Sequence, residues 1–443
     1  MILRSSRRSV SQLLVLVHLA AGLVAVSGLA RAAEAPAAKE AAKVAAAGDE
    51  GILLEPESFL AKIARLRDAR GRFPDGTRLV FSPGEYRLEP QAYVDSTCGN
   101  CEEPATQVAA TLGLRISGSH VVLTAQEAGK ATIFTDAGYG LLFADCQDCA
   151  LSGLTITGGR RDPDPNATDA AVLVQRGAVS IEDCLITDNI GDSTLLATQT
   201  VGIIGIAGRE GGQLSIRRNR IRRNSWDGIA LYRGAEALIE RNEIDGVDTA
   251  GADTPGGGRG VAIGATWDAK AKIFDNTLSH YWKGIGVFVD ADCLIRKNYV
   301  LDMKTWGIAV WDAGKGSPRA RIEGNIIFQT GACGIAITLE RPDGSDPGHC
   351  TYNVLLRTGL DPAYDSPDLY CVQCPIAAAA RPQSFEIKGN MLFDNRRVPR
   401  DAGIEFPDME EKDFRVHYGA MFEDLPIDSH LFFNEKLPPK MGH

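Results

Sequence analysis

The sequence lacks long apolar runs outside its N-terminal segment. Only the stretch from Leu13 to Leu29 approaches the roughly eighteen apolar residues that a membrane-spanning helix needs. That stretch follows a basic segment, Arg4 to Arg8, and small residues of the cleavage-site type come directly after it, at 30–35. This order is typical of an export signal. We therefore expect residues 1–32 to be removed and the mature protein to be periplasmic or secreted, without membrane insertion.

The sequence also lacks an excess of positive charge. It contains 47 lysines and arginines against 57 aspartates and glutamates, a formal net charge of −10. Loss of residues 1–32 removes four arginines and brings the charge to about −14. A chain this acidic repels polyanions at long range. We expect no nucleic-acid partner, and a polyanionic sugar would need a local basic cleft.

Histidines are missing from the positions where the cysteine pairs would need them for zinc. Six of the ten cysteines form the pairs Cys98–Cys101, Cys146–Cys149 and Cys371–Cys374, and no His stands at zinc-finger spacing. In an exported chain we expect a local disulfide or buried packing for these pairs. Zinc between two converging pairs and a redox dithiol are the alternatives. We expect the other cysteines to fill the core; they are Cys184, Cys293, Cys333 and Cys350.

One phrase is repeated along the chain. An I-x-x-N-x-I pattern places asparagines at 219, 242, 276, 298, 325 and 390, with a weaker match at Asn353. Most are followed by a turn and then by Gly-apolar-x-apolar, beginning at Gly228, Gly260, Gly284, Gly307 and Gly334. Intervals of 23 to 32 residues are typical of a solenoid. The apolar residues alternate within each unit, which predicts strands with one face inward.

This phrase resembles the right-handed parallel β-helix of the pectate-lyase-like superfamily. Residues 76–89 resemble that superfamily's entry strand with its Pro-Gly-x-Tyr turn, and the amphipathic segment 56–69 resembles its capping helix. The resemblance covers about residues 51–400. It implies an all-β solenoid with an N-terminal capping helix and an irregular C-terminal cap. The predicted parts are a signal peptide (1–32), an Ala-rich linker (33–50), a cap with entry strands (51–109), the parallel β-helix (110–395) and a C-terminal cap or tail (396–443).

Alternation after each Gly phrase predicts which side chains face outward. A column of small residues comes first (Ala230, Ala262, Gly286, Ala309 and Ala336), and a mixed column follows (Tyr232, Gly264, Phe288, Trp311 and Thr338). A small-residue floor beside aromatic rings suits the stacking of sugars. The alternative is an aromatic ladder that only stabilises the sheet. The candidate substrate-binding residues are Trp226, Tyr232, Trp282, Phe288, Trp306 and Trp311.

Charged residues precede the same glycines. Asp227, Arg259 and Lys283 stand immediately before them, and Tyr281 and His280 come shortly before Lys283. Such a set suits the binding of a uronate carboxylate and the abstraction of its C5 proton, as in polysaccharide lyases and uronate epimerases of the resembled superfamily. We predict Lys283 or Tyr281 as proton abstractor, Arg259 as carboxylate clamp and Asp227 as orienting group, with His280 as a further candidate. The alternative is a surface salt-bridge ladder.

Two sets of acids suggest other chemistry. The loop 160–171 alternates Asp162, Asp164, Asn166 and Asp169, a pattern that suits calcium, although it lacks the Gly and distal Glu of an EF-hand. Calcium is the cofactor that the sequence predicts. Acids also occur near strand ends, where they suit a glycoside hydrolase pair, a calcium site or ordinary turns; these are Asp268, Asp290, Asp292 and Asp312.

The sequence predicts the function of the protein less specifically than its fold. A glycine-rich insertion, 248–259, lengthens one unit beside the charged set, where specificity loops commonly lie. The sequence contains neither the Asn-x-Asp, Asp-Asp and Gly-His-Gly set of pectin hydrolases nor the Asp-Pro-His phrase of mannuronan epimerases. We predict a monomeric exported protein that acts on a uronate polysaccharide or oligosaccharide, as a lyase or C5-epimerase rather than a glycoside hydrolase. The alternative is a non-catalytic periplasmic carbohydrate-binding or accessory β-helix, similar to the protein that assists nitrous-oxide-reductase maturation.

Overall fold

The structure is a computed structural model, and it describes residues 51–192, 201–247, 258–340, 343–359, 361 and 373–395. Every described residue belongs to one compact unit, which begins at Gly51. The predicted signal peptide, linker and C-terminal cap lie outside the described residues. No helix in the described part of the chain has the length and apolar character needed to cross a membrane.

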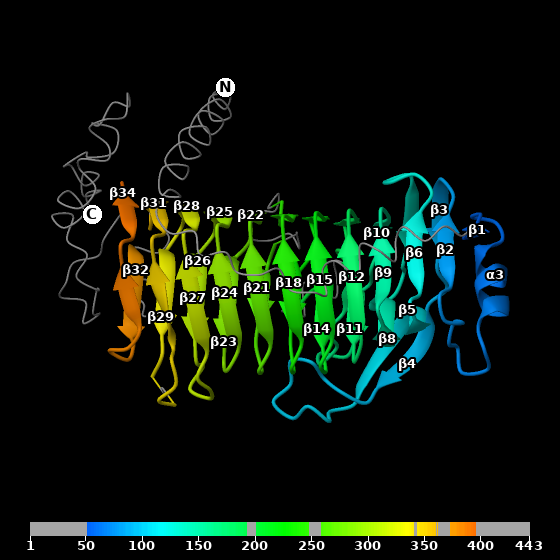
Figure 1. The fold of residues 1–443 in the computed structure, drawn as a ribbon, viewed down its shortest axis with the longest axis horizontal. Helices are drawn as coiled ribbons and strands as arrows, with labels where there is room; N and C mark the ends of the chain where they lie inside the picture. Colours follow the sequence, from blue (N-terminus) through cyan, green and yellow to red (C-terminus); the bar gives the residue numbers. More distant parts are fainter. Residues whose placement is uncertain are drawn as a thin grey trace, which may run out of the picture. The chain divides into compact units, whose positions relative to one another are not determined.

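Three long sheets run side by side, and successive strands of the chain visit them in turn (Figure 1). Sheet A consists of β1 (Ile52–Leu54), β2 (Arg78–Phe81), β6 (Val122–Ala125), β9 (Cys149–Ser152), β12 (Ala178–Glu182), β15 (Gln213–Arg217), β18 (Glu236–Glu240), β21 (Lys270–Phe274), β24 (Asp292–Arg296), β27 (Arg319–Glu323), β30 (Gly348–Thr351) and β33 (Glu386–Lys388). Sheet B consists of β3 (Gly84–Arg87), β7 (Ala131–Phe134), β10 (Thr155–Thr157), β13 (Leu185–Thr187), β16 (Arg220–Arg222), β19 (Glu243–Asp245), β22 (Thr277–Ser279), β25 (Tyr299–Met303), β28 (Ile326–Thr330), β31 (Val354–Thr358) and β34 (Met391–Phe393).

Sheet C carries the face on which the candidate site lies. It consists of β4 (Gln91–Asp95), β5 (Val108–Ser119), β8 (Tyr139–Gln147), β11 (Ala170–Gln175), β14 (Ile204–Arg209), β17 (Ile229–Leu231), β20 (Val261–Ala265), β23 (Lys283–Phe288), β26 (Trp306–Trp311), β29 (Cys333–Thr338) and β32 (Cys374–Ala380). Strands β4 and β5 pair antiparallel, whereas the strands from β5 to β32 pair parallel to their neighbours. One coil is therefore a strand of sheet C, then one of A, then one of B, which confirms the predicted solenoid.

The core is a set of stacked apolar columns. In sheet C, one isoleucine follows another in register, and each is fully buried; these are Ile206, Ile229, Ile263, Ile285, Ile308 and Ile335. Burying one such side chain stabilises the fold by roughly 1.5–3 kcal/mol. A Gly precedes five of these six isoleucines, Ala262 before Ile263 being the exception. The small residue is required because a Cβ at Gly284 or Gly307 would lie 2.3 Å or 2.6 Å from the carbonyl oxygen of the next coil. The repeated Gly-Ile pair thus reflects close stacking of coils.

The asparagines form a continuous ladder at the corner between sheets A and B. Each side-chain carbonyl accepts the backbone N–H and the side-chain amide of the preceding asparagine, at 2.8–3.1 Å. The residue before each one adopts a left-handed backbone, for example Arg218 (φ 53°) and Lys297 (φ 57°). Asn353, the weaker sequence match, is a full member of the ladder. These bonds satisfy polar groups that the tight corner buries.

An N-terminal helix covers the first coil, as predicted. Helix α3 (Phe59–Leu66) is shorter than the amphipathic segment 56–69, and it buries Phe59 and Ile63 against the coil interior. Tyr86, from the Pro-Gly-x-Tyr turn, is fully buried, and its hydroxyl donates to the carbonyl oxygens of Leu54 and Ser82 at 2.8 Å. The cap excludes water from apolar residues that the first coil would otherwise expose.

The described cysteines match expectation. Cys98 and Cys101 form a local disulfide, and Cys146 and Cys149 are free and buried. Cys184, Cys293 and Cys350 fill the core as predicted. Cys333 is buried as well, in a separate apolar cluster with Cys374, with the sulfur atoms 3.6 Å apart. Cys371 lies outside the described residues.

Candidate functional site

The outer face of sheet C has three columns of side chains. In its open part the first column contains Val261, Lys283, Trp306 and Cys333; the second contains Gly264, Gly286, Ala309 and Ala336; the third ends with Phe288, Trp311 and Thr338. The glycine and the isoleucine of each Gly-Ile pair both face the interior, so inward and outward side chains do not alternate strictly there. The residue before each pair therefore faces outward and belongs to the first column. The face is therefore a small-residue floor between two rows of larger side chains.

The register corrects two sequence predictions. Ile229 pairs with Ile263, so Val261, not Arg259, occupies the place in the column between Asp227 and Lys283. Arg259 lies before the strand, and burial lowers the pKa of its guanidinium. Ala262 faces the core rather than the solvent, because insertion 248–259 displaces the Gly phrase of this coil by two residues. The predicted alternation of Asp227, Arg259 and Lys283 along one column is therefore wrong.

Aromatic side chains flank the floor where its residues are smallest. The ring of Phe288 lies over Gly286, where a Cβ would come within 2.4 Å of two ring carbons. Trp311, 37% exposed, meets Phe288 edge to face at 6.5 Å. On the opposite side, the Nζ of Lys283 lies 5.1 Å from the centre of the Trp306 ring. Among the described residues, no hydrogen-bond partner reaches the buried Nε1 of Trp306.

Asp227 is the most perturbed acid of this face. Its side chain is buried, and this desolvation raises its pKa to about 7, although a backbone N–H bond and the charge of Lys283 act in the opposite direction. The Oδ1 atom accepts the N–H of Val261 at 2.6 Å. The Oδ2 atom faces the space above Gly264, because a Cβ there would lie 4.0 Å from it. An acid with this pKa exchanges protons near neutral pH.

Tyr281 is not part of the outer face. Its side chain is 0% exposed and packs within the core. Burial raises the pKa of its hydroxyl far above the usual range. The prediction of Tyr281 as a proton abstractor is therefore wrong, because alternation does not extend back into the turn that precedes β23. A substrate on the outer face cannot contact this hydroxyl.

The other predicted residues lie at different distances from the floor. His280 follows β22 at the edge of sheet B, where its Nδ1 lies 2.8 Å from Oδ1 of Asp245. Trp282 is 41% exposed in the turn beside the first column. Trp226 is half-buried against an apolar cluster, and Tyr232 belongs to the third column but is only 5% exposed. The structure thus brings Asp227 and Lys283 to one face, and places His280 elsewhere. The aromatic residues in the columns of this face are Tyr232, Phe288, Trp306 and Trp311.

Two loops cover the outer face of sheet C upstream of the open part, and together we call them the roof (residues 96–107 and 160–169). Beneath it the same columns carry buried residues, among them Tyr139, Leu142, Leu173, Ala207 and Ala230. The first roof loop follows Asp95, which pairs with the fully buried Arg209 and accepts the side-chain amide of Gln175 at 3.1 Å. In Figure 1 this loop, between β4 and β5, extends past β8 and β11 towards β14.

The second roof loop contains the predicted calcium ligands, and its acids bind protein groups. Asp162 accepts the N–H and hydroxyl of Thr111 at 2.7 and 2.8 Å. Asp164 accepts the N–H of Ala109 at 2.9 Å, and buried Asp169 binds Arg161 at 2.6 Å. Burial nevertheless raises the pKa of Asp169 to about 7. The backbone carbonyl oxygen of Asn166 lies 3.5 Å from the Sγ atom of the disulfide-bonded Cys98.

These bonds give the alternating acids a role in holding the roof. Within the described residues, no three His, Cys, Asp or Glu side chains are arranged to hold a metal ion. Calcium therefore stays a prediction that a binding measurement has to test.

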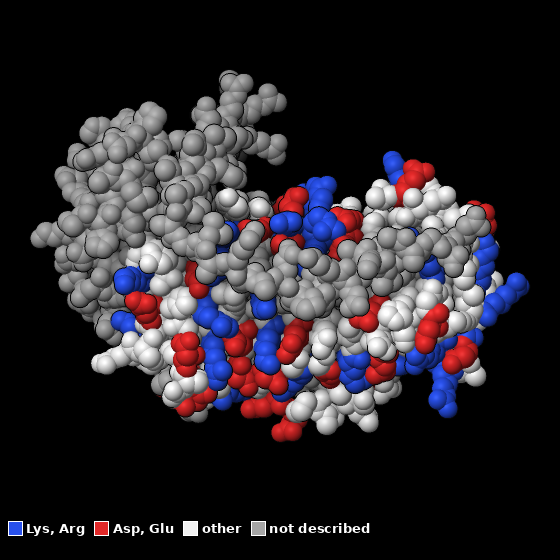
Figure 2. Space-filling model, in the orientation of Figure 1, with Lys and Arg blue, Asp and Glu red and all other residues white. Residues whose placement is uncertain are grey.

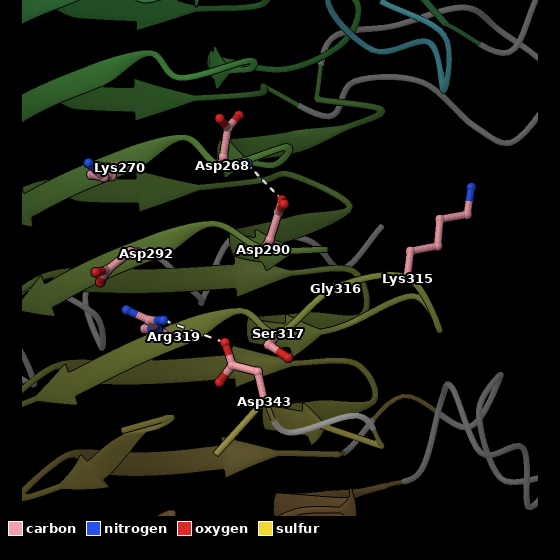
Figure 3. A pocket seen from close by; sticks show the side chains of 9 residues that line it. All are labelled: Asp268, Lys270, Asp290, Asp292, Lys315, Gly316, Ser317, Arg319 and Asp343. Carbon is pink, nitrogen blue, oxygen red and sulfur yellow. Dashed lines mark hydrogen bonds and ion pairs between the residues drawn. The ribbon is translucent and has the colours of Figure 1, made fainter. Parts of the chain in front are cut away.

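The acids at the strand ends line an open hollow of about 370 Å³ (Figure 3). Asp290 accepts the N–H of Asp268 at 2.6 Å, and Arg319 pairs with Asp343 at 3.6 Å. The hollow also contains Lys270, Asp292 and Lys315. Asp312 is fully buried and accepts the N–H groups of Gly314 and Glu340 at 2.9 and 2.6 Å. These bonds within and between turns favour the interpretation as turn residues.

Charges of both signs are interleaved over the surface. Along sheet A, Lys270, Asp292 and Arg319 follow one another in register, and Figure 2 shows positive and negative side chains mixed over the viewed face. Such exposed pairs contribute little to stability.

The sequence does not predict the pair of Asp95 and Arg209, because the two residues are 114 positions apart. The one signal of this pair in the sequence is an arginine, Arg209, in an otherwise apolar strand.

Comparison with known proteins identifies the family. A family model described as "Right handed beta helix region" matches residues 110–263 and 202–346. No curated protein matches the chain. Similar solved structures include the A-module of mannuronan C-5 epimerase AlgE4 from Azotobacter vinelandii (13% identity, 71% of this chain and 78% of that chain, TM-score 0.44). A hyperthermoactive exopolygalacturonase from Thermotoga maritima is 10% identical (80% and 96% covered, TM-score 0.47). PfbA, a surface adhesin of Streptococcus pneumoniae, is 9% identical (72% and 69% covered, TM-score 0.39). Because the family model covers more than half of the sequence, the chain belongs to the right-handed β-helix family.

Proposed function

We propose that the open part of the sheet C face binds an acidic carbohydrate polymer and that the protein is a lyase or C5-epimerase of its uronate residues. The observation that carries this proposal is the buried carboxyl of Asp227, whose pKa is raised to about 7 next to the charge of Lys283. The glycine at 264 leaves space beside its Oδ2 atom. Acids with perturbed pKa values are typical of catalytic sites.

The chemistry requires a base and a cation. The ionised carboxylate of Asp227 takes the proton from C5 of a uronate, and the electron pair left on C5 delocalises into the uronate carboxylate. The ammonium of Lys283 stabilises the charge that develops there. Expulsion of the C4 oxygen, which takes up the proton that Asp227 removed, then gives the unsaturated product of a lyase. Delivery of a proton from water on the opposite side, after which Asp227 releases its proton to solvent, gives the C5 epimer. These roles differ from the sequence-based prediction, in which Lys283 or Tyr281 abstracted the proton and Asp227 was the orienting group.

Recognition of the sugar rests on the aromatic residues. Trp311 and Phe288 offer ring surface next to the floor at Ala309 and Ala336, and such surfaces stack on sugar rings. The local cation Lys283 offsets the long-range repulsion between an acidic protein and a polyanion.

Purified protein incubated with a panel of uronate polysaccharides, with and without calcium, tests the proposal. A rise in ultraviolet absorbance would report the unsaturated product of a lyase. Exchange of the C5 proton for deuterium, followed by NMR, would report an epimerase. Absence of both reactions across the panel would contradict catalysis, and a change in either activity on calcium chelation would test the predicted cofactor.

A non-catalytic carbohydrate-binding role is the second candidate. Asp227 is only 6% exposed, which limits direct access of a substrate, whereas Trp311 and Trp282 are 37% and 41% exposed. Binding of uronate oligosaccharides by calorimetry, without turnover or proton exchange, would favour this role.

A further inference from the structure

The outer face of sheet C changes abruptly from covered to open along the solenoid. From β8 to β17 the residues of the third column, Ala144, Gln175, Arg209 and Tyr232, are at most 5% exposed. From β23 onwards the third column holds the half-buried Phe288 and Thr338 and Trp311, which is 37% exposed. The architecture of the strands is the same in both parts. The difference therefore comes from the roof.

The two roof loops contact one another. The Sγ atom of Cys98 lies 3.5 Å from the carbonyl oxygen of Asn166, and Cys98, Val108 and Ala167 form one buried cluster. A Cβ at Gly99 would lie 2.9 Å from Arg209 and 3.3 Å from Tyr232. No ligand fits between this loop and the strands below it, because backbone and side chains are in van der Waals contact there.

The tip of the first roof loop is anchored to the turns that follow successive strands of sheet C. Arg233 donates to the carbonyl oxygens of Cys101 and Glu102, and Trp267 donates through Nε1 to Asn100 at 3.2 Å. Further along, Lys315 pairs with Glu102 at 3.2 Å. The disulfide between Cys98 and Cys101 fixes the shape of the tip. The loop is thus held where the covered part of the face ends.

From this arrangement we propose that the open part of the sheet C face takes only the end of a carbohydrate chain. A polymer that lay along the columns would run into the Cys98–Cys101 segment next to Tyr232, and it has to terminate there. Asp227 lies on the coil at this boundary, so the terminal sugar, or the bond next to it, is the one that meets the carboxyl. This inference rests on the proposed function, and it adds that the protein acts from a chain terminus rather than at interior residues.

Binding of end-modified ligands separates this inference from the proposed function. The probes are a short uronate oligosaccharide, the same compound with a bulky fluorophore on its reducing end, and the same compound with the fluorophore on its non-reducing end. We expect one of the two modified forms to bind more than about tenfold more weakly than the unmodified form, equivalent to 1.4 kcal/mol. Equal binding of all three forms would overturn the chain-end inference and leave the proposed function intact. Failure of all three to bind would overturn the proposed function itself.

A roof-loosened variant, Trp267→Phe with Lys315→Ala, provides the matched test. It removes one hydrogen bond and one ion pair at the loop tip and leaves the columns unchanged. Hydrogen exchange over residues 96–107 would verify that the loop is looser. We then expect the two modified forms to differ less in binding, and long polymers to yield products of many sizes if turnover occurs. Arg296→Ala, which loses an ion pair with Glu323 on sheet A, serves as the control. Unchanged end preference despite a loosened loop would overturn the role of the roof.

Discussion

The covered and open parts of the sheet C face are built from the same strand pattern and differ in what lies on them. Under the roof, outward positions hold Leu142, Leu173 and a buried ion pair between Arg209 and Asp95. In the open part, equivalent positions hold glycine, alanine and partly exposed aromatic residues. A single type of coil thus serves as an interior in one place and as a binding surface in another. The surrounding loops, rather than the solenoid, determine which role a coil has.

The largest expected effect concerns the acid at the boundary between the two parts. We expect Asp227→Asn to lower lyase or epimerase turnover by about 10²–10⁴-fold, because the amide cannot accept the C5 proton. Activity of the wild-type protein should rise as the pH increases through about 7, where Asp227 loses its proton. Turnover measured from pH 5 to 9 tests both expectations. Asp268→Asn, a strand-end acid in a turn, is the control and should retain activity.

The same acid should shape the pH dependence of stability. Its pKa is raised in the folded protein, so between its ordinary pKa near 4 and about 7 the folded state holds a proton that the unfolded state releases. The free energy of unfolding therefore falls as the pH rises through this range. Asp227→Asn should flatten this slope in urea unfolding measured at several pH values. A slope identical to that of the wild type would contradict the raised pKa.

The next effect concerns the covered part. Asp95→Ala removes one of the two carboxylates that pair with the fully buried Arg209 and leaves only Glu210, at 3.3 Å, so the cost should be below the about 3–5 kcal/mol of breaking a buried pair completely. We expect a lower urea midpoint and faster proteolysis within residues 96–107. If the variant is as stable as the wild type, the Asp95–Arg209 pair does not hold the roof in place. This pair would then not explain why one part of the sheet C face is covered and the other is open.

A smaller effect is expected for an aromatic residue of the open part. Trp311→Ala should weaken binding of a uronate oligosaccharide by about 1 kcal/mol, because it removes ring surface beside the floor. Folding should be little affected, since Trp311 is 37% exposed. Isothermal titration calorimetry measures the affinity. Tyr352→Ala, which is 57% exposed at another corner of the coil, is the matched control and should bind as the wild type does.

The smallest effect is expected on sheet A, away from the covered and the open part of the sheet C face. Glu323 pairs with Arg296 and His349 on the outside of sheet A, and partly exposed pairs contribute about 0–1 kcal/mol. Glu323→Ala should therefore change the urea midpoint little, in contrast to Asp95→Ala. A loss as large as that of Asp95→Ala would show that surface charges, rather than the covered pair, dominate stability.

The repeated interior could be predicted from the sequence because each coil meets the same physical demand. The Ile columns follow from alternation, and the Asn ladder follows from its fixed position in each unit. Asn353 lacked the flanking isoleucine pattern, yet it joins the ladder, because the corner requires only the amide. Tyr281 could not be assigned to a face, since the backbone turns between sheet B and β23 and alternation does not apply within a turn.

The site was less predictable because it depends on contacts between distant segments. Arg259 was misplaced by two positions since an insertion hides the true register of β20 with β17. The roof depends on pairs such as Asp95 with Arg209 and Cys98 with Asn166, which are 114 and 68 residues apart. No periodic pattern connects such residues, so a single sequence gives no signal of where the open part of the face begins.

The anchors of the first roof loop have a mechanical consequence for the whole solenoid. In a stack of coils, each coil contacts only its neighbours, so unfolding can begin at an end and proceed one coil at a time. The segment from Asp95 to Glu102 joins Arg209 in β14 to Lys315 beyond β26, and it thereby links coils that do not touch. Peeling from the N-terminal end would have to release all these coils together. The loop therefore converts a nearest-neighbour chain into one cooperative block, which should resist pulling as a unit.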